Sequence, residues 1–206
     1  MSIYDGGYDD GYRACPCFWG KEVGSLITKF LEENEIEGSR ILDAGCGEGK
    51  NAVALAKLGA DVTAIDCSEV ALQNAKNAFG GNSVHWQCSD VRNLKAGGKP
   101  FDVVVAYGLL HCMQSADEIA SVVHRLQELT EVDGWNIICA FNDRQHDLSA
   151  HPGFDPCLVP HSTYLRHYQG WEVTFSSDED LHESHPHNNI PHVHSMTRLI
   201  ARKVKR

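Results

Sequence analysis

Residues 41–49 read Ile41-Leu42-Asp43-Ala44-Gly45-Cys46-Gly47-Glu48-Gly49, and this stretch decides the fold. It opens as a short apolar run of the kind that forms a buried strand, and three alternating glycines follow. A run of helix-forming residues then extends from Lys50 to Leu58. Strand, glycine turn and helix place bare backbone at a helix N-terminus, where a ligand can approach closely. We therefore expect a ligand site at this turn.

Two classes of cofactor bind at such turns. A dinucleotide fingerprint has the form G-x-G-x-x-G and requires glycine at position 50, which is Lys50 here. The pattern Asp43-x-Gly45-x-Gly47-x-Gly49 instead resembles motif I of the class I S-adenosylmethionine (SAM) methyltransferases. That resemblance implies that Asp43 helps hold the cofactor's ammonium and that its amino-acid end lies on the turn, at Gly45, Gly47, Gly49 and Asn51. The alternative is a tight turn that has collected glycines without a ligand.

The next strand-like segment, Ala60 to Asp66, ends in an acid 21 residues after Gly45. At this spacing a nucleotide-binding fold places the carboxylate that accepts hydrogen bonds from ribose hydroxyls. We therefore assign Asp66 to the ribose. The alternative is that Asp66 caps the helix that starts near Ser68.

A third acid follows a third strand-like segment, Val84 to Cys88. The resemblance implies that Asp90 meets the adenine amino group and that the backbone of Val91 faces the ring. Cys67, directly after Asp66, is included in the same cofactor site. Taken alone, Asp90 would equally be read as a loop carboxylate.

The composition is that of a globular protein, with 206 residues, 42% hydrophobic and 22% charged. No apolar run reaches about 18 residues and the first residues lack the features of a signal peptide, so we expect a cytoplasmic protein without membrane contact. The formal net charge of −10 disfavours nucleic acid, whose binders present a basic face. The eight cysteines include no C-x-x-C pair, so we expect thiols.

Strands and helices alternate with short connections from residue 40 to 141. We expect an α/β fold in one domain, a doubly wound, Rossmann-like and mostly parallel seven-stranded sheet with an antiparallel C-terminal strand. Residues 1–206 would divide into an N-terminal lid and helix (1–35), a SAM-binding core (36–141), and a substrate-side loop with a C-terminal hairpin (142–206). In detail we expect a helix from Lys21 to Asn34, a turn at Asp133-Gly134 and a fifth strand from Trp135 to Phe141.

Two candidate catalytic residues, Tyr107 and His111, follow the β-branched run Phe101 to Ala106. Ligands of open α/β sheets bind beyond the carboxyl ends of the strands. We expect Tyr107 to contact the cofactor and His111 to act as a base. The alternative for His111 is a structural histidine with a backbone partner.

The segment 4–19 is too aromatic for a disordered tail. If it covers the site as a lid, Tyr12 and Trp19 are substrate contacts, and Cys15 and Cys17 are candidates to touch a soft substrate. If it only covers a core edge, its aromatic residues are structural.

A narrower resemblance covers nearly the whole chain. The segments Tyr164 to Glu172, Leu181-His182 and Ala201-Arg202-Lys203 are similar to the tellurite-resistance methyltransferases of the TehB type. The resemblance implies substrate-handling residues on the last hairpin. His182 matches the family's histidine, whereas Glu183 stands where the family has arginine, and a second family arginine is replaced near His194 or Ser195. The loss of two cations argues against an oxyanion such as tellurite.

The region of this departure is rich in histidine, with five histidines within 13 residues: His182, His185, His187, His192 and His194. If the hairpin turns at Asn188-Asn189, His192 and His194 share one strand face. The group could bind a metal, line the substrate pocket, or be solvated at the surface. We assign no metal-ligating residue.

These features predict a SAM-dependent methyltransferase acting on a small molecule, with a soft acceptor such as a thiol or a selenium or tellurium species favoured. His111, His182 and Tyr107 are the catalytic candidates, and Tyr12, Trp19, Arg166 and His194 are the substrate candidates. The alternatives are an N- or O-methyltransferase for a small natural product, a metal-binding or sensing protein on a SAM-binding fold, and a catalytically silent SAM-binding protein. We expect a monomer or a homodimer.

Overall fold

The computed structural model describes residues 8–80, 83–94, 98–149, 151, 153–184 and 189–205. Its helices are α1 (Asp9–Ala14), α2 (Ser25–Leu31), α3 (Lys50–Lys57), α4 (Glu69–Phe79), α5 (Ala116–Leu129), α6 (His161–His167), and two short 3₁₀ turns, η1 (Val91–Asn93) and η2 (Leu110–Cys112). Its strands are β1 (Arg40–Ala44), β2 (Asp61–Asp66), β3 (Val84–Cys88), β4 (Phe101–Tyr107), β5 (Thr130–His146), β6 (Glu172–Glu183) and β7 (His192–Arg202).

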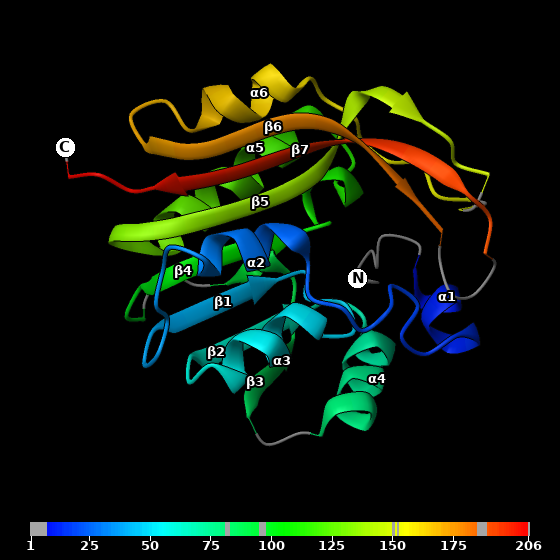
Figure 1. Ribbon diagram of the computed structural model, residues 1–206, viewed down its shortest axis with the longest axis horizontal. Coiled ribbons are helices and arrows are strands. Elements are labelled where there is room, and N and C mark those ends of the chain that lie inside the picture. Colours follow the sequence, from blue (N-terminus) through cyan, green and yellow to red (C-terminus); the bar gives the residue numbers. More distant parts are fainter. Residues whose placement is uncertain are drawn as a thin grey trace.

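The seven strands form one sheet in the order β3-β2-β1-β4-β5-β7-β6 (Figure 1). β1 to β5 pair in parallel, and β7 pairs antiparallel with both β5 and β6. The predicted mostly parallel, seven-stranded, Rossmann-like sheet with an antiparallel C-terminal strand is confirmed. The chain order reverses between β1 and β4, and ligands of this sheet type bind beyond the carboxyl ends of the strands at such a point.

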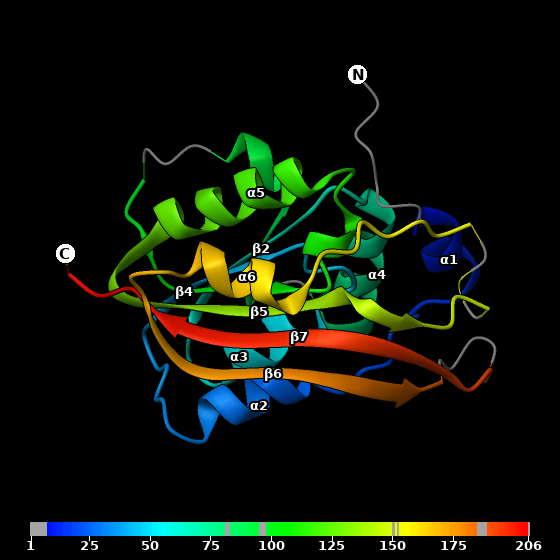
Figure 2. The same ribbon diagram turned by 90° about the horizontal axis from the view of Figure 1, so that it is seen from above.

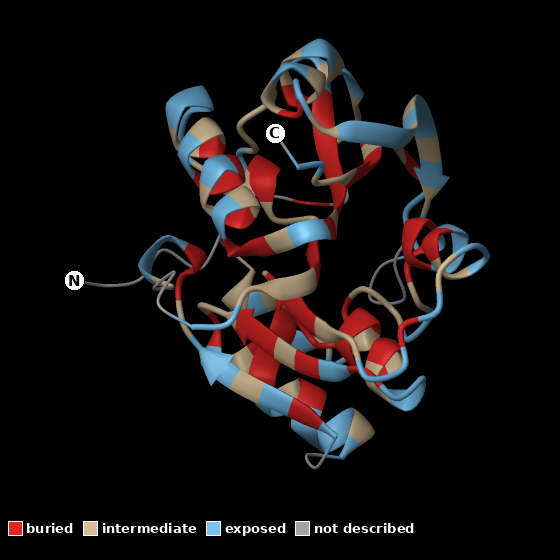
Figure 3. Ribbon diagram, turned by 90° about the vertical axis from the view of Figure 1, so that its left-hand side faces the viewer, coloured by how far each residue is buried: buried red, intermediate tan, exposed pale blue. Residues whose placement is uncertain are grey.

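Helices cover both faces of the sheet, with α5 and α6 on one face and α2 and α3 on the other (Figure 2). Successive side chains of β1 point to opposite faces of the sheet. Ile41 packs with α2 and α3 on one face, and Leu42 packs with α5 on the other. Figure 3 shows that buried residues gather in the interior of the molecule, and β6, at one edge of the sheet, is largely exposed.

Three local predictions differ from the structure. The helix expected from Lys21 to Asn34 is shorter, since α2 covers Ser25–Leu31, and α1 was not expected. The fifth strand begins at Thr130, not Trp135. Asp133 does adopt a turn-like φ of 66°, but its N–H donates to the carbonyl of Lys203. That pairing to the end of β7 extends the strand through the expected turn.

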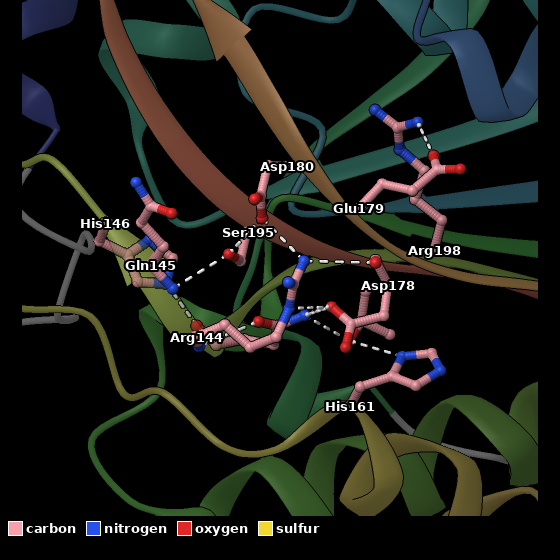
Figure 4. A network of polar contacts seen from close by, with 11 residues as sticks. Arg144, Gln145, His146, His161, Asp178, Glu179, Asp180, Ser195 and Arg198 are labelled. Atoms are coloured by element: carbon pink, nitrogen blue, oxygen red, sulfur yellow. Dashed lines mark hydrogen bonds and ion pairs between the residues drawn. The ribbon is translucent and has the colours of Figure 1, made fainter.

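A polar network joins the ends of β5, β6 and β7 (Figure 4). The guanidinium of Arg144 donates to Asp178 Oδ1 and Asp180 Oδ1, each at 2.7 Å. Ser195 donates to Asp180 at 2.6 Å. These contacts hold the end of β6 against its neighbours, close to the residues of the cavity described below.

Among the described residues, no helix is both long enough and apolar enough to cross a membrane. All eight cysteines are thiols.

Candidate active site

The glycine turn between β1 and α3 requires its glycines. Gly45, Gly47 and Gly49 have φ values of 69°, 52° and 76°, in the left-handed region that glycine adopts without strain. A Cβ at Gly49 would lie 2.3 Å from the Trp86 ring, and one at Gly45 would lie 2.8 Å from the Leu109 side chain. The turn therefore leaves no room for a side chain at Gly45 or Gly49, and Gly45 and Gly47 present bare backbone to the adjacent cavity.

A cavity of about 240 Å³ opens beside this turn, at the carboxyl ends of the parallel strands. Eleven of the predicted site residues line it: Tyr12, Trp19, Gly45, Gly47, Asn51, Asp66, Cys67, Asp90, Val91, Tyr107 and His111. Five others do not line it: Asp43, Gly49, Arg166, His182 and His194. Its wall also carries residues that were not singled out, among them Glu48, Lys50, Arg92, Glu118, Phe141 and Glu183. With five carboxylates against two cations, this wall suits a positively charged ligand.

Asp66 stands at the end of β2 with both carboxylate oxygens turned to backbone donors. Oδ2 accepts from the N–H of Gly47 at 2.7 Å, and Oδ1 accepts from the N–H of Ser68 at 2.9 Å. Burial raises the pKa of Asp66, and these two hydrogen bonds oppose that rise. The helix cap is Ser68, whose Oγ accepts from the N–H of Ala71 at 3.0 Å. Asp66 is thus fixed next to the glycine turn, with lone pairs left for a diol.

Asp43 lies behind the glycine turn and is 1% exposed. Neither carboxylate oxygen has a hydrogen-bond partner among the described residues. The pKa of Asp43 is raised to about 7, chiefly by burial. The nearby backbone of Ala52 opposes this rise, although it forms no hydrogen bond with the carboxylate, and the charge of Asp66 adds to it. An unpartnered buried carboxyl is costly unless a cation or a donor approaches it. Asp43 therefore fits a ligand that brings an ammonium to this turn.

Asp90 ends the loop after β3 and caps η1, since Oδ1 accepts from the N–H of Arg92 at 2.8 Å. Arg92 also forms ion pairs with the carboxylates of Asp90 and Glu118. Burial alone would raise the pKa of Asp90, but the hydrogen bonds from Arg92 outweigh it and the net pKa is lowered. Asp90 is therefore an ionised, fixed acceptor in the cavity wall.

The N-terminal segment, residues 8–24, is fastened to the glycine turn and the helix that follows it. Glu48 accepts from the N–H groups of Cys17 and Phe18 at 2.7 and 2.6 Å. Asn51 accepts from the N–H of Gly24 at 2.9 Å, and Lys50 donates to the carbonyl of Trp19 at 2.9 Å. The segment is thus placed over the site like a lid. Glu48 was not among the predicted site residues, although an acidic residue inside a glycine turn is a sign that its side chain binds another segment.

Aromatic side chains of this segment form part of the cavity wall. Trp19 Nε1 donates to the hydroxyl of the buried Tyr12 at 3.2 Å, and Tyr8 packs edge-on against Trp19 with ring centroids 5.1 Å apart. These rings pack together as a small core and also face the cavity.

Tyr107 closes the same wall beside α2. A Cβ at Gly24 would lie 2.4 Å from its ring, so glycine is required there for the close approach. Burial raises the pKa of Tyr107, so its hydroxyl stays protonated. In this state Tyr107 can donate a hydrogen bond and cannot take a proton as a base.

His111 is buried and stacked on Phe141, with ring centroids 4.0 Å apart and planes 5° apart. Its Nδ1 accepts from the backbone N–H of Phe141 at 3.0 Å. In a neutral imidazole the proton must then be on Nε2. Burial, followed by His146 and His151, lowers the pKa of His111 to about 3. His111 therefore offers an Nε2–H donor, which does not suit the predicted role of base; it has the backbone partner that the alternative foresaw.

At the end of β6, Glu183 lines the cavity and the predicted catalytic residue His182 does not. His182 is exposed and pairs across the sheet with Val193, whereas Leu181 and Glu183 line the cavity. Because side chains alternate along a strand, His182 points away from the site and Glu183 points into it. Burial raises the pKa of Glu183, and His192, Lys50 and Arg198 oppose this rise. The structure gives His182 no catalytic position.

Two substrate candidates also lie away from the cavity. Arg166 is exposed on α6 and donates to Thr163 at 2.7 Å. His194 is fully buried and stacks on the face of Phe141, with ring centroids 4.2 Å apart. His185 and His187 lie outside the described residues.

Comparison with known proteins gives related families and folds. A methyltransferase-domain family matches residues 41–134. A ubiquinone biosynthesis O-methyltransferase of Coxiella burnetii is 36% identical over 91 residues, a match that spans 43% of this chain and 39% of that protein. The chain thus aligns with about two fifths of this relative's length.

Two solved structures share the fold. TehB from Haemophilus influenzae superimposes with a TM-score of 0.72 at 19% identity, over 97% of this chain and 67% of that one. Magnesium protoporphyrin IX methyltransferase (ChlM) from Synechocystis PCC 6803, crystallised with bound SAM, gives a TM-score of 0.64 at 18% identity, over 87% of this chain and 76% of that one.

The residues beside the glycine turn of this chain fit SAM. The bare glycine turn, the unpartnered Asp43 and the acceptor Asp66 suit an ammonium and a diol, and the acidic wall suits a cationic ligand. Residues 41–134 of this chain match a methyltransferase-domain family and the fold resembles that of TehB, and together these similarities support a SAM-dependent methyltransferase.

Proposed function

We propose that the protein transfers the methyl group of SAM to a small uncharged molecule with a soft nucleophile, a thiol or its selenium or tellurium counterpart. The observation that carries this proposal is Glu183, a half-buried carboxyl in the cavity wall with a raised pKa. His111 is held as a donor and His182 points outward, so Glu183 replaces them as the candidate base.

Different residues of the site would bind the cofactor and activate the acceptor. When bound, SAM supplies a methyl group on a sulfonium, so the leaving group needs no acid. Asp43 and Asp66 hold its ammonium and ribose, and the lid residues Tyr12 and Trp19 exclude water. Glu183 takes the proton that the acceptor thiol loses as its sulfur bonds to the methyl carbon. A raised carboxyl pKa lies nearer that of a thiol, which favours this transfer.

The charge of the wall argues against an anionic acceptor. Glu183 occupies the position where the resemblance implies an arginine, and it would repel an oxyanion at close range. Lys50 lies within electrostatic reach of Glu183, but burial lowers the pKa of that lysine. A neutral acceptor avoids this repulsion.

A second candidate is methyl transfer to an oxygen or nitrogen acceptor. It is favoured by the 36% identity, over 91 residues, to an enzyme named as an O-methyltransferase of ubiquinone biosynthesis. An aromatic acceptor would also suit the rings of Tyr12, Trp19 and Phe141 in the wall.

Transfer of labelled methyl from SAM to a panel of neutral thiols, selenols, catechols and amines tests the proposal. We expect thiols or selenols to accept, and Glu183→Gln to lower kcat by about 100-fold or more. Glu172→Gln, an exposed carboxylate at the far end of the same strand, is the matched control. Preferred methylation of catechols or amines would assign the site to the second candidate, and unchanged turnover of thiols in Glu183→Gln would remove Glu183 as the base.

A further inference from the structure

Three buried histidines meet behind the cavity wall. His192 and His194 project from the same face of β7, and His151 reaches them from the loop after β5. One ring nitrogen from each lies within 4.8 Å of the others. Figure 1 shows the start of β7 and the end of β6 on the same side of the molecule as α1.

The hydrogen bonds around the cluster decide which nitrogens carry protons. His192 Nδ1 lies 2.7 Å from the carbonyl of Ile190, so it must carry its proton and Nε2 keeps a lone pair. His146 Nε2 contacts the carbonyl of Asn142 and must likewise be protonated, which leaves His146 Nδ1 as an acceptor. His194 Nδ1, 3.2 Å away, then donates to it.

This leaves a lone pair on Nε2 of His194, where no described group donates to it. A buried acceptor without a partner is costly. A cation that accepts lone pairs would satisfy Nε2 of His194.

The spacing also suits such a cation. Nε2 of His151 and Nε2 of His192 lie 3.3 Å apart. Two ligands bound tetrahedrally at about 2.0–2.1 Å, the usual zinc–nitrogen distance, are separated by about 3.3 Å. Bonds from the far ring nitrogens to carbonyls or other acceptors, as His192 and His194 have, are the usual support of metal-bound imidazoles.

We propose that His151, His192 and His194 bind a divalent transition-metal ion of the zinc class through their Nε2 atoms. Imidazole ligands in a tetrahedral set favour zinc over magnesium or calcium.

The site would tie together segments that are distant in sequence. His151 stacks on Trp19 of the lid with ring centroids 5.8 Å apart, and His194 stacks on Phe141. Both partners line the cavity, so the metal fixes the acceptor end of the site without being needed for SAM binding.

Metal analysis of tag-free protein tests the proposal. The protein is stripped with a chelator, loaded with Zn²⁺ and dialysed, and its zinc content and affinity are measured by mass spectrometry and calorimetry. We expect one zinc per chain. We expect His192→Ala, His194→Ala and His151→Ala each to weaken binding by more than about 100-fold, since loss of even a second-shell partner costs about 10- to 100-fold. Loading with Co²⁺ should give the visible absorption of a four-coordinate site.

Two controls keep the outcome clear. His124→Ala removes an exposed histidine of α5. The double variant His185→Ala, His187→Ala removes two further histidines of the histidine-rich stretch between His182 and His194. Zinc content no higher than background in the wild type, or loss of zinc only in the double variant, overturns the proposal. Calorimetry with SAM on each variant confirms folding, and failed SAM binding with intact zinc binding would contradict the proposed function instead.

Discussion

The carboxylate of Glu48 accepts a hydrogen bond of 2.6 Å from the backbone N–H of Phe18, across 30 positions of sequence. Its other oxygen accepts from the N–H of Cys17. Glu48 belongs to the glycine turn, and Phe18 belongs to the segment that covers the cavity. The turn that would hold the cofactor and the segment that would cover it are therefore joined directly by hydrogen bonds.

We expect Glu48→Ala to loosen the lid and weaken SAM binding. Two buried N–H groups lose a charged acceptor, and such hydrogen bonds contribute about 1.5–3 kcal/mol to stability. Urea unfolding should show a loss of this order, and amide exchange should accelerate at Cys17 and Phe18. Glu33→Ala, at an exposed position after α2, should change neither quantity. Unaltered exchange at these amides would mean that the lid is held by its aromatic contacts.

Asp66→Asn should raise the Kd for SAM by roughly 100-fold. The amide keeps one acceptor but turns an NH₂ group toward either Gly47 or Ser68, both of which donate to the carboxylate. Hydrogen bonds to charged groups contribute about 1.5–3 kcal/mol, and a 100-fold change in Kd corresponds to the upper part of this range. Calorimetry with Asp61→Asn, an exposed acid at the start of the same strand, provides the comparison. Equal affinity of the two variants for SAM would remove Asp66 from the cofactor site.

Asp43 should make the stability of the cofactor-free protein depend on pH. Its pKa of about 7 in the folded protein exceeds the ordinary value of 3.8, so the folded state binds more protons between these limits. The free energy of unfolding should fall as the pH rises from about 4 to about 7 and then level off. The span is about 4 kcal/mol, at 1.36 kcal/mol per pKa unit.

Asp43→Asn should flatten this dependence and bind SAM more weakly, because the ammonium then lacks a counter-charge. SAM binding to the wild type near pH 7 should release about half a proton per site, because a carboxyl with a pKa of about 7 is half protonated there and a cation favours its ionised form. Calorimetry in buffers of different ionisation enthalpy measures that proton. A variant whose stability follows the wild-type pH curve would show that another group causes the slope.

His111 should act as a donor and should not titrate in the working range. The pKa of about 3, which follows from burial, keeps it neutral from pH 5 to 8, and nitrogen NMR should find the proton on Nε2 throughout. His111→Gln can accept from Phe141 and donate into the cavity, so it should retain more activity than His111→Leu. His111→Leu leaves the Phe141 N–H unpaired, at about 1–3 kcal/mol. Titration of His111 near pH 6.5 would restore its candidacy as a base.

Much of the site was predictable because it is local in sequence. The three glycines must follow β1 directly, and the acids at the ends of β2 and β3 follow from parallel strands ending at one edge. Asp66 and Asp90 were therefore placed in the cavity by spacing and by resemblance. The lid's aromatic content likewise indicated a covering role for Tyr12 and Trp19, and both line the cavity.

The doubly wound, mostly parallel sheet, the glycine turn and the acids that follow β2 and β3 could be read from the sequence, because strand–helix alternation and turn chemistry act over a few residues. Only the tertiary structure decided that Glu183 rather than His182 faces the cavity, since one step of strand phase exchanges the two faces. It alone gave His111 its tautomer, through the N–H of Phe141, and brought His151 to His192 and His194. Such contacts join residues 30 to 43 positions apart, and no local pattern encodes which of them will meet.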